Sequence, residues 1–480
     1  MKVLPLRPAD HASPEALRGF LAQCQLAAQS DGQDRLVSIS ITVGALDPLA
    51  VLEAIYEPGH PHFYAERPTA GTAVAGAEVA VEFSAAGERR FEALQAFVDG
   101  TLARTIAVGD VDAPFGGPHF FVAGTFFDET KSDEPFAPVT AFVPRWQVSR
   151  AGDKTTAVAN VPVAAGADLA VLSERVWRAH QKFARFSFGG GSATAGPQSE
   201  SRPVPHHFKT HETGDYHAAV GRGLEAIAAG EVEKIVLARC VEVTADAPLH
   251  PLAVLNGLRQ RFPDCFAFSV ANGRGDSFIG ASPERLVRVS QGVLETEALA
   301  GTARRGVSAV EDAAAGAALV ASEKDRREQA MVLASIQRRL APLGLTLEHA
   351  DEPTLLRLAN VQHLHTPVRA TLPEGVRLLD TLRALFPTPA VGGTPRAPAM
   401  RRIAELEDFP RGLYAGTVGW MNARGGGEFL VGIRSALVRE ERAYVYAGAG
   451  IVAGSTPEKE FAETELKFRA LLEALIPVHR

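Results

Sequence analysis

Residues 265–300, CFAFSVANGRGDSFIGASPERLVRVSQGVLETEALA, decide the fold class of this chain. They contain four short runs dominated by β-branched and aromatic residues, separated by NGRGD, by Ser-Pro and by QG. Gly, Asn, Asp, Ser and Pro are the residues that tight turns require. Strand-like runs joined by such short turns predict an antiparallel meander.

The segments on either side of this stretch add helices and further strands. Helical spacing of apolar residues, with Gly230 as a stop, and runs of β-branched residues predict these elements. The predicted helices are 216–229, 251–262, 311–340 and 457–476, and the predicted strands are 234–243, 414–422, 428–435 and 443–447. No unit of about 20 to 50 residues repeats, which excludes solenoids and propellers. The predicted class is α+β with substantial antiparallel sheet, not a βαβ array.

A shift in composition divides the chain. Residues 188–217 are dense in Gly, Ser, Pro and polar side chains and show no periodicity. We therefore expect residues 1–190 to form an N-terminal half, residues 191–214 to form a linker loop, and residues 215–478 to carry the chemistry. The N-terminal half alternates short strands with helical stretches and offers few residues suited to catalysis.

The composition describes a compact globular chain of 480 residues, because 46% hydrophobic content supports a large core. A net charge of −7 provides no broad basic field, so we expect neither nucleic acid nor a membrane as a partner. The three cysteines are too few and too widely spaced for a disulfide framework or a zinc site; we expect them to be buried. The first ten residues lack the apolar region of a signal peptide, and a cytoplasmic location is expected.

Lys234 begins the strand predicted at residues 234–243. Strand alternation places it on one face with Val236 and Ala238, so a lysine heads an otherwise apolar face. Such a lysine can extend its amine to solvent. It can also be buried, and burial would lower its pKa and make it a usable base.

Two predicted helices carry carboxylates that share a face. In the last helix, Glu460, Glu463 and Lys467 fall within an arc of about 60° near the positive N-terminal end. Glu465 lies on the far side of that helix. Glu328 lies in the string SEKDRREQ, among lysines and arginines. Taken alone, both patterns are more typical of solvated surfaces with ion pairs than of a functional site.

Two further motifs are ambiguous. Glu284 follows a proline between two strand-like runs, and a loop glutamate is usually solvated. His363 and His365 have the H-x-H spacing of metal ligands, but without a nearby third His or Cys they also fit hydrogen-bonded loop histidines. The glycine-rich strings AGTARRG, VGGTP and YAGAGIVAGS offer backbone N–H groups to an anion, although none has the spacing of a P-loop.

Taken together, these strings resemble the chorismate-utilising enzyme family, which includes isochorismate, salicylate, anthranilate and aminodeoxychorismate synthases. The resemblance covers about residues 216–476. It is carried by EKIVLAR, FIGASPE, ALAGTARRG, SEKDRREQ, VQHLHT, FPTPAVGGTP, LYAGTVGW, GIRSA, AGAGIV and GSTPEKEFAETELK, in that order. It implies a sandwich of two large, roughly orthogonal sheets with helices outside, and a chorismate site between the sheets.

The resemblance also implies roles for individual residues. Lys234 matches the base that activates water, and Glu284 matches the acid that faces the departing hydroxyl. Mg²⁺ would be held by Glu328 and Glu463, with Glu460 beside it and acting through water. The other matches are substrate contacts: Arg434, Tyr414 and Gly448 around the pyruvyl carboxylate, and Gly301, Thr302, His363 and Lys467 elsewhere.

Within the family, the nucleophile separates the members. Members that use ammonia have Gln at the position of Lys234, since ammonia needs no deprotonation and water does. Ala300 stands where aminodeoxychorismate synthases of the covalent type have a nucleophilic Lys. The resemblance therefore implies an isochorismate synthase that needs no glutaminase subunit. A monomer is expected, although the sequence leaves the oligomeric state open.

Several alternatives stay open. Salicylate synthases share every residue named above, although the length and the string PHFFVAGTFFD at residues 118–128 are similar to isochorismate synthases of the menaquinone type. A glutaminase-partnered anthranilate or aminodeoxychorismate synthase subunit, or a silent chorismate-binding subunit, is a further alternative. The family commonly has His at the position of Gln329, so the surroundings of the metal are open. The sequence does not separate a menaquinone from a siderophore pathway.

Overall fold

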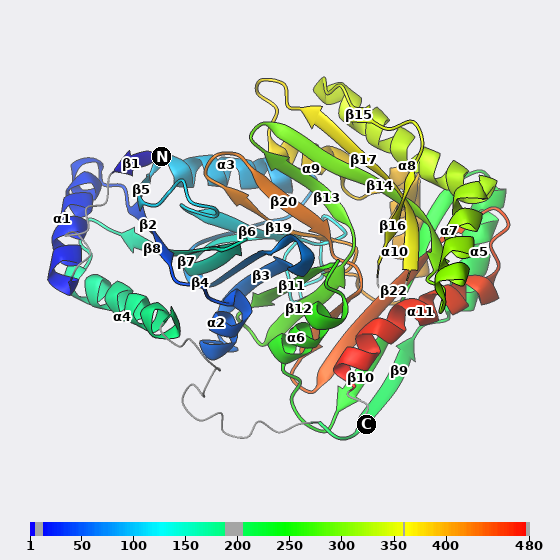
Figure 1. Ribbon diagram of the computed structural model, residues 1–480, viewed down its shortest axis with the longest axis horizontal. Coiled ribbons are helices and arrows are strands. Elements are labelled where there is room, and N and C mark those ends of the chain that lie inside the picture. Colours follow the sequence, from blue (N-terminus) through cyan, green and yellow to red (C-terminus); the bar gives the residue numbers. More distant parts are fainter. Residues whose placement is uncertain (5–12, 188–204, 359–360, 477–480) are drawn as a thin grey trace.

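The computed structural model describes residues 1–4, 13–187, 205–358 and 361–476 (Figure 1). Every strand in these ranges belongs to one hydrogen-bonded network. It has two arms that branch at β7 (Val139–Ala151), whose first part pairs with β6 (His119–Gly124) and whose last part pairs with β8 (Lys154–Val163). No helix in the described ranges is long and apolar enough to cross a membrane.

The first arm joins the two halves of the chain. From one end to the other its strands are β1 (Lys2–Leu4), β5 (Thr105–Gly109), β2 (Arg35–Val43), β8, β7, β4 (Thr72–Ala85), β3 (Pro61–Arg67), β11 (Phe266–Asn272), β12 (Asp276–Ser282), β21 (Ser435–Arg439), β22 (Arg442–Val452) and β10 (Lys234–Ala245). Along the outer edge of β10 lie β9 (Phe208–Thr213) and β18 (Gly393–Thr394). The pairing of β3 with β11 makes the halves one continuous sheet.

The second arm continues from β6. Its strands are β19 (Thr417–Asn422), β20 (Gly427–Val431), β13 (Arg285–Ser290), β14 (Val293–Arg304) and β17 (Val361–Thr371), with β15 (Glu348–His349) and β16 (Thr354–Arg357) outermost. Apart from the pairs of β5 with β1 and with β2, all strand pairs in the described ranges are antiparallel. The predicted α+β class with antiparallel sheet is confirmed.

The meander predicted over residues 265–300 is wrong at its centre. β11 pairs with β12, and β13 pairs with β14, but β12 continues to β21 whereas β13 continues to β20. The chain therefore crosses from one arm to the other at residues 282–284. Pro283 has no N–H to donate, so ladder pairing ends there. This corner places Glu284 at the boundary between the arms.

Aromatic side chains fill the space between the arms. Phe63 of β3 and Phe121 of β6 stack with ring centroids 4.4 Å apart, and both are buried. Stacked aromatic pairs add packing energy beyond the area that they bury. The arms therefore face one another across a shared core, as expected of a sandwich. The three cysteines are buried and free, as predicted.

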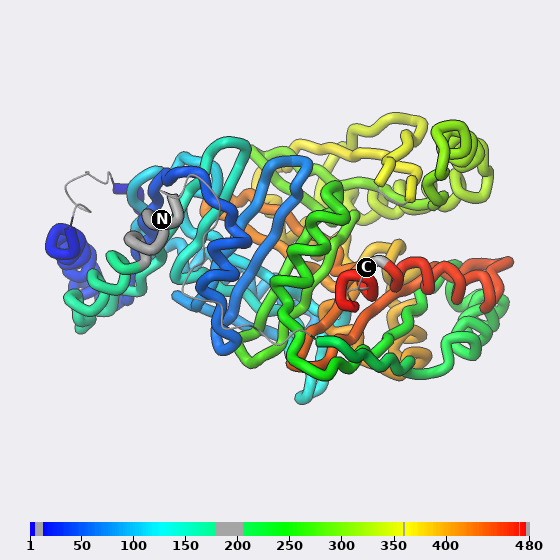
Figure 2. Tube along the Cα trace, turned by 60° about the horizontal axis from the view of Figure 1, so that its bottom comes forward, coloured from blue at the N-terminus to red at the C-terminus, as the bar shows by residue number. Residues whose placement is uncertain are grey.

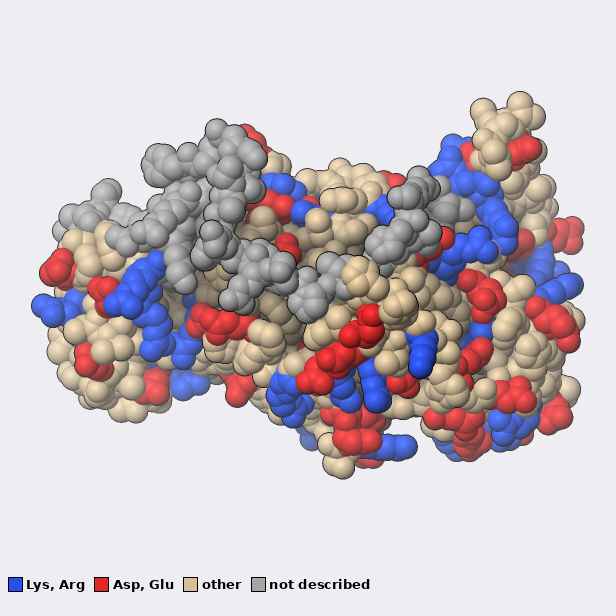
Figure 3. Space-filling view, turned by 90° about the horizontal axis from the view of Figure 1, so that it is seen from below, with Lys and Arg blue, Asp and Glu red and all other residues tan. Residues whose placement is uncertain are grey.

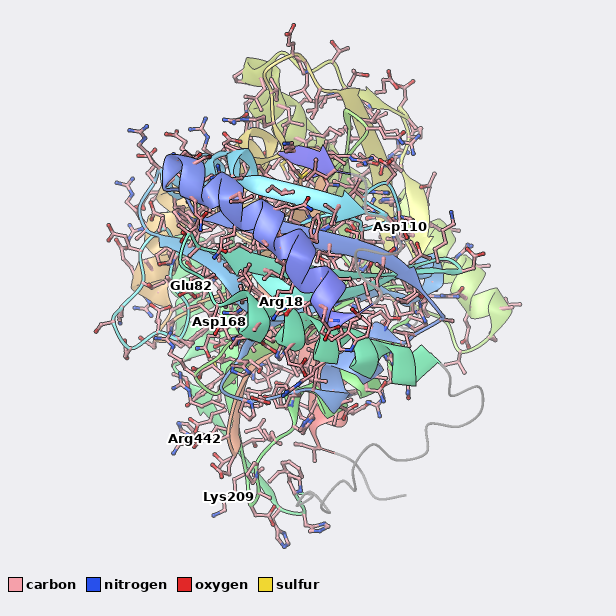
Figure 4. The ribbon with its side chains drawn as sticks, turned by 90° about the vertical axis from the view of Figure 1, so that its left-hand side faces the viewer. Arg18, Glu82, Asp110, Asp168, Lys209 and Arg442 are labelled. Atoms are coloured by element: carbon pink, nitrogen blue, oxygen red, sulfur yellow. The ribbon has the colours of Figure 1, made fainter. Side chains whose placement is uncertain are left out.

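Helices cover the outer faces (Figure 1). α1 (Pro14–Asp31) and α4 (Leu169–Ser187) pack side by side over the N-terminal end of the first arm (Figure 4). The remaining helices are α2 (Pro48–Ala54), α3 (Arg90–Ala103), α5 (Tyr216–Ala228), α6 (Pro251–Arg261), α7 (Ala309–Ala321), α8 (Glu323–Leu340), α9 (Leu378–Leu385), α10 (Arg396–Leu406), α11 (Pro457–Leu475) and the single turns Pro68–Ala70 and Ala341–Leu343. At the end of the molecule opposite α1, α11 lies on one side and α7 on the other (Figure 2).

Among the predicted boundaries that differ from the structure are those of one helix and of the linker. The helix expected over residues 311–340 is two helices, because Ser322 ends α7 and caps α8 by accepting the N–H of Asp325 at 3.3 Å. The linker expected over residues 191–214 includes β9, whose polar sequence FKTHET lacks strand alternation but completes the edge of β10. Residues 191–204 of that linker lie outside the described residues.

Acidic and basic side chains are interspersed on the face shown in Figure 3. This mixture agrees with the small net charge of the chain.

Candidate active site

Lys234 is a buried lysine at the start of β10. Its side chain is 9% exposed, and its Nζ donates a hydrogen bond to Oε1 of Glu328 on α8 across 2.8 Å. A Cβ on Gly450, in the neighbouring strand β22, would come within 2.9 Å of Cε of Lys234, so the glycine provides the room that the lysine occupies. Of the two possibilities left by the sequence, burial is the one observed.

Glu328 carries a charge that Lys234 stabilises. Burial alone would raise the pKa of Glu328, but the charge and the hydrogen bond of Lys234 outweigh burial and hold that pKa below its ordinary value. Lys324 and Lys467 add to this effect. Lys324 lies on α8 and Lys467 on α11, so the two helices contribute to one electrostatic environment.

The N-terminal part of α11 supplies two more carboxylates. Glu460 is 8% exposed, and its pKa is raised by burial and by the negative charge of Glu463. Lys467 donates hydrogen bonds from Nζ to the carbonyl oxygen of Gly448 and to Oε1 of Glu463, each 2.7 Å long. The prediction that Glu460, Glu463 and Lys467 share one face of the helix is confirmed. The i,i+4 ion pair expected of a solvated surface, between Glu463 and Lys467, is also present.

The donor set on α8 and α11 fits a divalent cation. Carboxylate oxygens are the ligands that Mg²⁺ prefers, and Glu463 lies close enough to Glu460 for its charge to add to burial in raising the pKa of Glu460. Within the described residues, however, no three metal-ligating side chains already stand close enough together to hold an ion. Glu328 and Glu463 are each engaged by a lysine instead.

Glu284 occupies the corner between β12 and β13. Its backbone is fixed from both arms, because its N–H donates to Oγ of Ser282 at 3.2 Å and its carbonyl oxygen accepts from Val431 N–H at 3.2 Å. Burial, and next the negative charge of Glu297, raise the pKa of Glu284 to about 7, against the opposing effects of Lys234 and Thr388. A carboxyl with this pKa can still hold a proton near neutral pH. The solvated loop expected as the alternative is not observed.

The sequence does not single out Glu297, and it indicates His365 only as part of the H-x-H motif. Nε2 of His365 lies 2.8 Å from Oε2 of Glu297, and Oε1 of Glu297 accepts the backbone N–H of Arg285 at 3.1 Å. Both histidines of the H-x-H motif lie in strand β17 and not in a loop, which corrects that alternative. The i,i+2 spacing of the two histidines is the feature of the sequence that could have indicated a strand, because alternate residues of a strand lie on one face.

His363 connects β17 with the glycine-rich turn of β14. Its Nδ1 lies 3.0 Å from Oγ1 of Thr302 and 3.3 Å from the carbonyl oxygen of Gly301, which has φ 71°. Burial, and next the positive charge of Arg434, lower the pKa of His363 to about 4, so the imidazole is neutral. Its Nε2 is buried and has no hydrogen-bond partner in the described part of the chain.

Arg434 is a half-buried cation with no carboxylate partner within ion-pair distance among the described residues. Its φ of 49° is left-handed, which is uncommon for a non-glycine residue and is typical of functional positions. Tyr414 lies beside Gly448 of β22, because a Cβ on Gly448 would come within 2.8 Å of the Tyr414 hydroxyl oxygen. The strand predicted to reach residue 435 ends at Val431, which leaves Arg434 outside the ladder.

Gln329, which departs from the family pattern, is a structural link. It is buried, and its Nε2 donates to the carbonyl oxygen of Ala298 at 2.8 Å and to Oγ1 of Thr366 at 3.0 Å. These bonds fasten α8, and with it Glu328, to β14 and β17.

Comparison with known proteins finds relatives of one kind. A family model described as chorismate binding enzyme matches residues 20–476. The salicylate biosynthesis isochorismate synthase of Pseudomonas aeruginosa is 35% identical over 487 aligned positions, covering 99% of this chain and 96% of that protein. The isochorismate synthase EntC of Escherichia coli is 36% identical, over 58% of this chain and 72% of its own length.

Solved structures agree. The menaquinone-specific isochorismate synthase MenF of Escherichia coli superposes with a TM-score of 0.75 at 26% identity, covering 96% of this chain and 99% of that one. Anthranilate synthase component I of Streptococcus pneumoniae, at 22% identity and a TM-score of 0.68, covers 85% of this chain and 93% of its own and shares the fold.

Proposed function

The chain belongs to the chorismate binding enzymes, and from this premise we propose that it is an isochorismate synthase, which adds water at C2 of chorismate and releases the C4 hydroxyl. The identity with the Pseudomonas aeruginosa isochorismate synthase, which extends along nearly all of both chains, supports this assignment. The observation that carries it is the buried Lys234 in one site with Glu284. Water must lose a proton as it attacks, and ammonia need not.

Two side chains carry the proton transfers in this proposal. Nζ of Lys234 accepts a proton from the water that attacks C2, and the carboxyl of Glu284 donates a proton to the hydroxyl that leaves C4. One water enters and one leaves, so the product is an isomer of the substrate. Lys234 acts as a base only in its neutral form, and in this structure its Nζ donates a hydrogen bond to Glu328.

The remaining polar groups would hold the substrate. Arg434, which lacks a carboxylate partner in the described ranges, would pair with the pyruvyl carboxylate beside the Tyr414 hydroxyl and the backbone at Gly448. Donation from Nδ1 of His363 to the Gly301 oxygen leaves Nε2 as an acceptor for a substrate hydroxyl.

Mg²⁺ is the proposed cofactor. Glu328 and Glu463 would hold it, with Glu460 contributing through water. Bound there, the cation would neutralise the ring carboxylate of chorismate and draw electron density from the ring. The carboxylate donor set on α8 and α11, in which the charge of Glu463 acts on Glu460, supports this assignment.

The relatives' names include both a salicylate and a menaquinone pathway, so only the step that they share is assigned. The purified chain, incubated with chorismate and Mg²⁺ and with no ammonia or partner subunit, should yield isochorismate by chromatography and mass spectrometry. Salicylate with pyruvate would establish the salicylate synthase alternative. Anthranilate formed only with ammonia would establish the glutaminase-partnered alternative.

A further inference from the structure

Glu284 shares a small cavity with a second carboxylate. Glu284, Glu297, Thr388 and Ser335 line this cavity, which lies between the second arm, α8 and the loop that follows α9. The two glutamates are also linked through the backbone: the N–H of Arg285, the residue after Glu284, donates to Oε1 of Glu297 at 3.1 Å. The Glu297 carboxylate is therefore bound to the peptide group that follows Glu284, the proposed acid.

The structure holds Glu297 in the charged form. Each of its oxygens has a hydrogen-bond partner, Oε1 from Arg285 N–H and Oε2 from Nε2 of His365 at 2.8 Å. Burial would raise the pKa of Glu297, but the hydrogen bond and charge of His365 and the charge of Arg285 outweigh burial and lower it. One carboxylate of the pair is thus fixed in place as an anion.

We propose that Glu297 is a positioning residue, whose anchored negative charge keeps the neighbouring Glu284 carboxyl protonated until it gives its proton to the departing hydroxyl. Two carboxylates that share a site cannot both ionise readily, and the better-anchored one ionises first. This inference rests on the proposed function, because it needs Glu284 to act as the acid. It assigns no contact with substrate to Glu297.

The other charged groups around Glu284 are cations, and each of them is engaged by another partner. Lys234 on β10 favours the ionised form, but it is paired with Glu328. Arg285 on β13 is paired with Glu428 at 2.7 Å. Arg339 on α8 lines the same cavity and donates its hydrogen bonds to the carbonyl oxygens of Leu385 and Pro387.

The test compares Glu297→Gln with the matched control Glu295→Gln. Glu295 lies on the same strand, but its carboxylate pairs with Arg369 and Arg288 away from the cavity. In Glu297→Gln the repulsion is removed, so the high-pH limb of kcat/KM should move to lower pH by roughly one unit, with less change at low pH. Glu297→Asp, which keeps the charge, should restore part of the shift, and Glu295→Gln should leave the limb in place.

A second readout does not depend on turnover. Infrared difference titration of the chorismate-free enzyme should show the protonated carboxyl band of Glu284, identified by its loss in Glu284→Gln. That band should titrate at lower pH in Glu297→Gln. A uniform fall in kcat with an unmoved limb and an unmoved band would mean that Glu297 is only structural and would overturn the inference. A shifted band in an enzyme that forms no isochorismate would support the carboxylate pair and overturn the proposed function.

Discussion

Nζ of Lys234 lies 2.8 Å from Oε1 of Glu328, and this ion pair joins strand β10 to helix α8. The proposed base and a proposed metal ligand are therefore direct partners. Any group that draws the Glu328 carboxylate away also breaks the hydrogen bond that Nζ of Lys234 donates to it.

Replacement of Lys234 by Ala should lower kcat by about 10²- to 10⁴-fold, the usual cost of losing a general base. Isochorismate formation measured at several pH values checks this, with thermal unfolding to confirm that the variant is folded. Lys459→Gln, an exposed lysine in the first turn of α11, is the control and should be unaffected. Near-normal turnover in Lys234→Ala would assign the base elsewhere.

Replacement of Glu284 by Gln keeps the shape of the side chain but removes the transferable proton. Turnover should collapse while chorismate still binds in the presence of Mg²⁺, as titration calorimetry would show. In the unmodified enzyme the acid must be protonated, so activity should decline as the pH rises through about 7. A normal rate in Glu284→Gln would identify another acid.

The same variant should change the pH dependence of stability. The pKa of Glu284 is raised in the folded state, so its contribution to stability is complete below the ordinary glutamate value and is lost as the pH rises to about 7. Glu284→Gln should therefore gain stability relative to the unmodified chain between about pH 5 and pH 8. Urea unfolding at both pH values measures this. Parallel changes in the two proteins would show that the carboxyl is not destabilised by burial.

The sequence predicts much of this architecture because the strongest signals are local. Helices 216–229 and 457–476 and the strand at Lys234 follow from periodicity and caps, and they agree with α5, α11 and β10 to within a few residues. The crossing between arms at residues 282–284 was missed, since turn residues show that a strand ends but not which strand pairs with the next one.

The contacts around Glu284 could not be predicted for a related reason. Glu297 meets His365 because β14 pairs with β17, with Leu299 opposite His365. That register depends on packing between distant segments. Similarly, a helical wheel places Glu465 opposite Glu463, but it does not reveal that the buried Arg239 of β10 lies there.

Replacement of Arg434 by Gln should weaken chorismate binding by roughly 10- to 100-fold, the usual cost of a charged hydrogen bond to a carboxylate. The measurement is the Kd for chorismate by calorimetry, together with KM. Arg442→Gln, an exposed arginine at the start of β22, is the control and should bind normally. Equal Kd values for the two variants would exclude Arg434 from the substrate pocket.

Glu465 is not the neutral control that its helical position predicts. Its Oε1 lies 2.7 Å from Nη1 of Arg239, a buried arginine that also pairs with Glu212. Glu465→Ala should therefore lower the free energy of unfolding by about 1 kcal/mol, the usual net value of a hydrogen bond. The Mg²⁺ concentration for half-maximal activity should stay the same. A shifted Mg²⁺ requirement with normal stability would place Glu465 in the metal site.

Glu328 and Glu463 lie on different helices, α8 and α11, and each is engaged by a lysine in this structure. A cation that bridges them must compete with those lysines, so chelation should abolish activity and added Mg²⁺ should restore it. Glu328→Gln and Glu463→Gln should each raise the Mg²⁺ concentration for half-maximal activity by at least about 10-fold, because one charged ligand is lost. Glu458→Gln, at an exposed carboxylate in the first turn of α11, should leave that concentration unchanged. A full rate in excess chelator, or equal effects at Glu458 and Glu463, would mean that this face of α11 does not bind the metal.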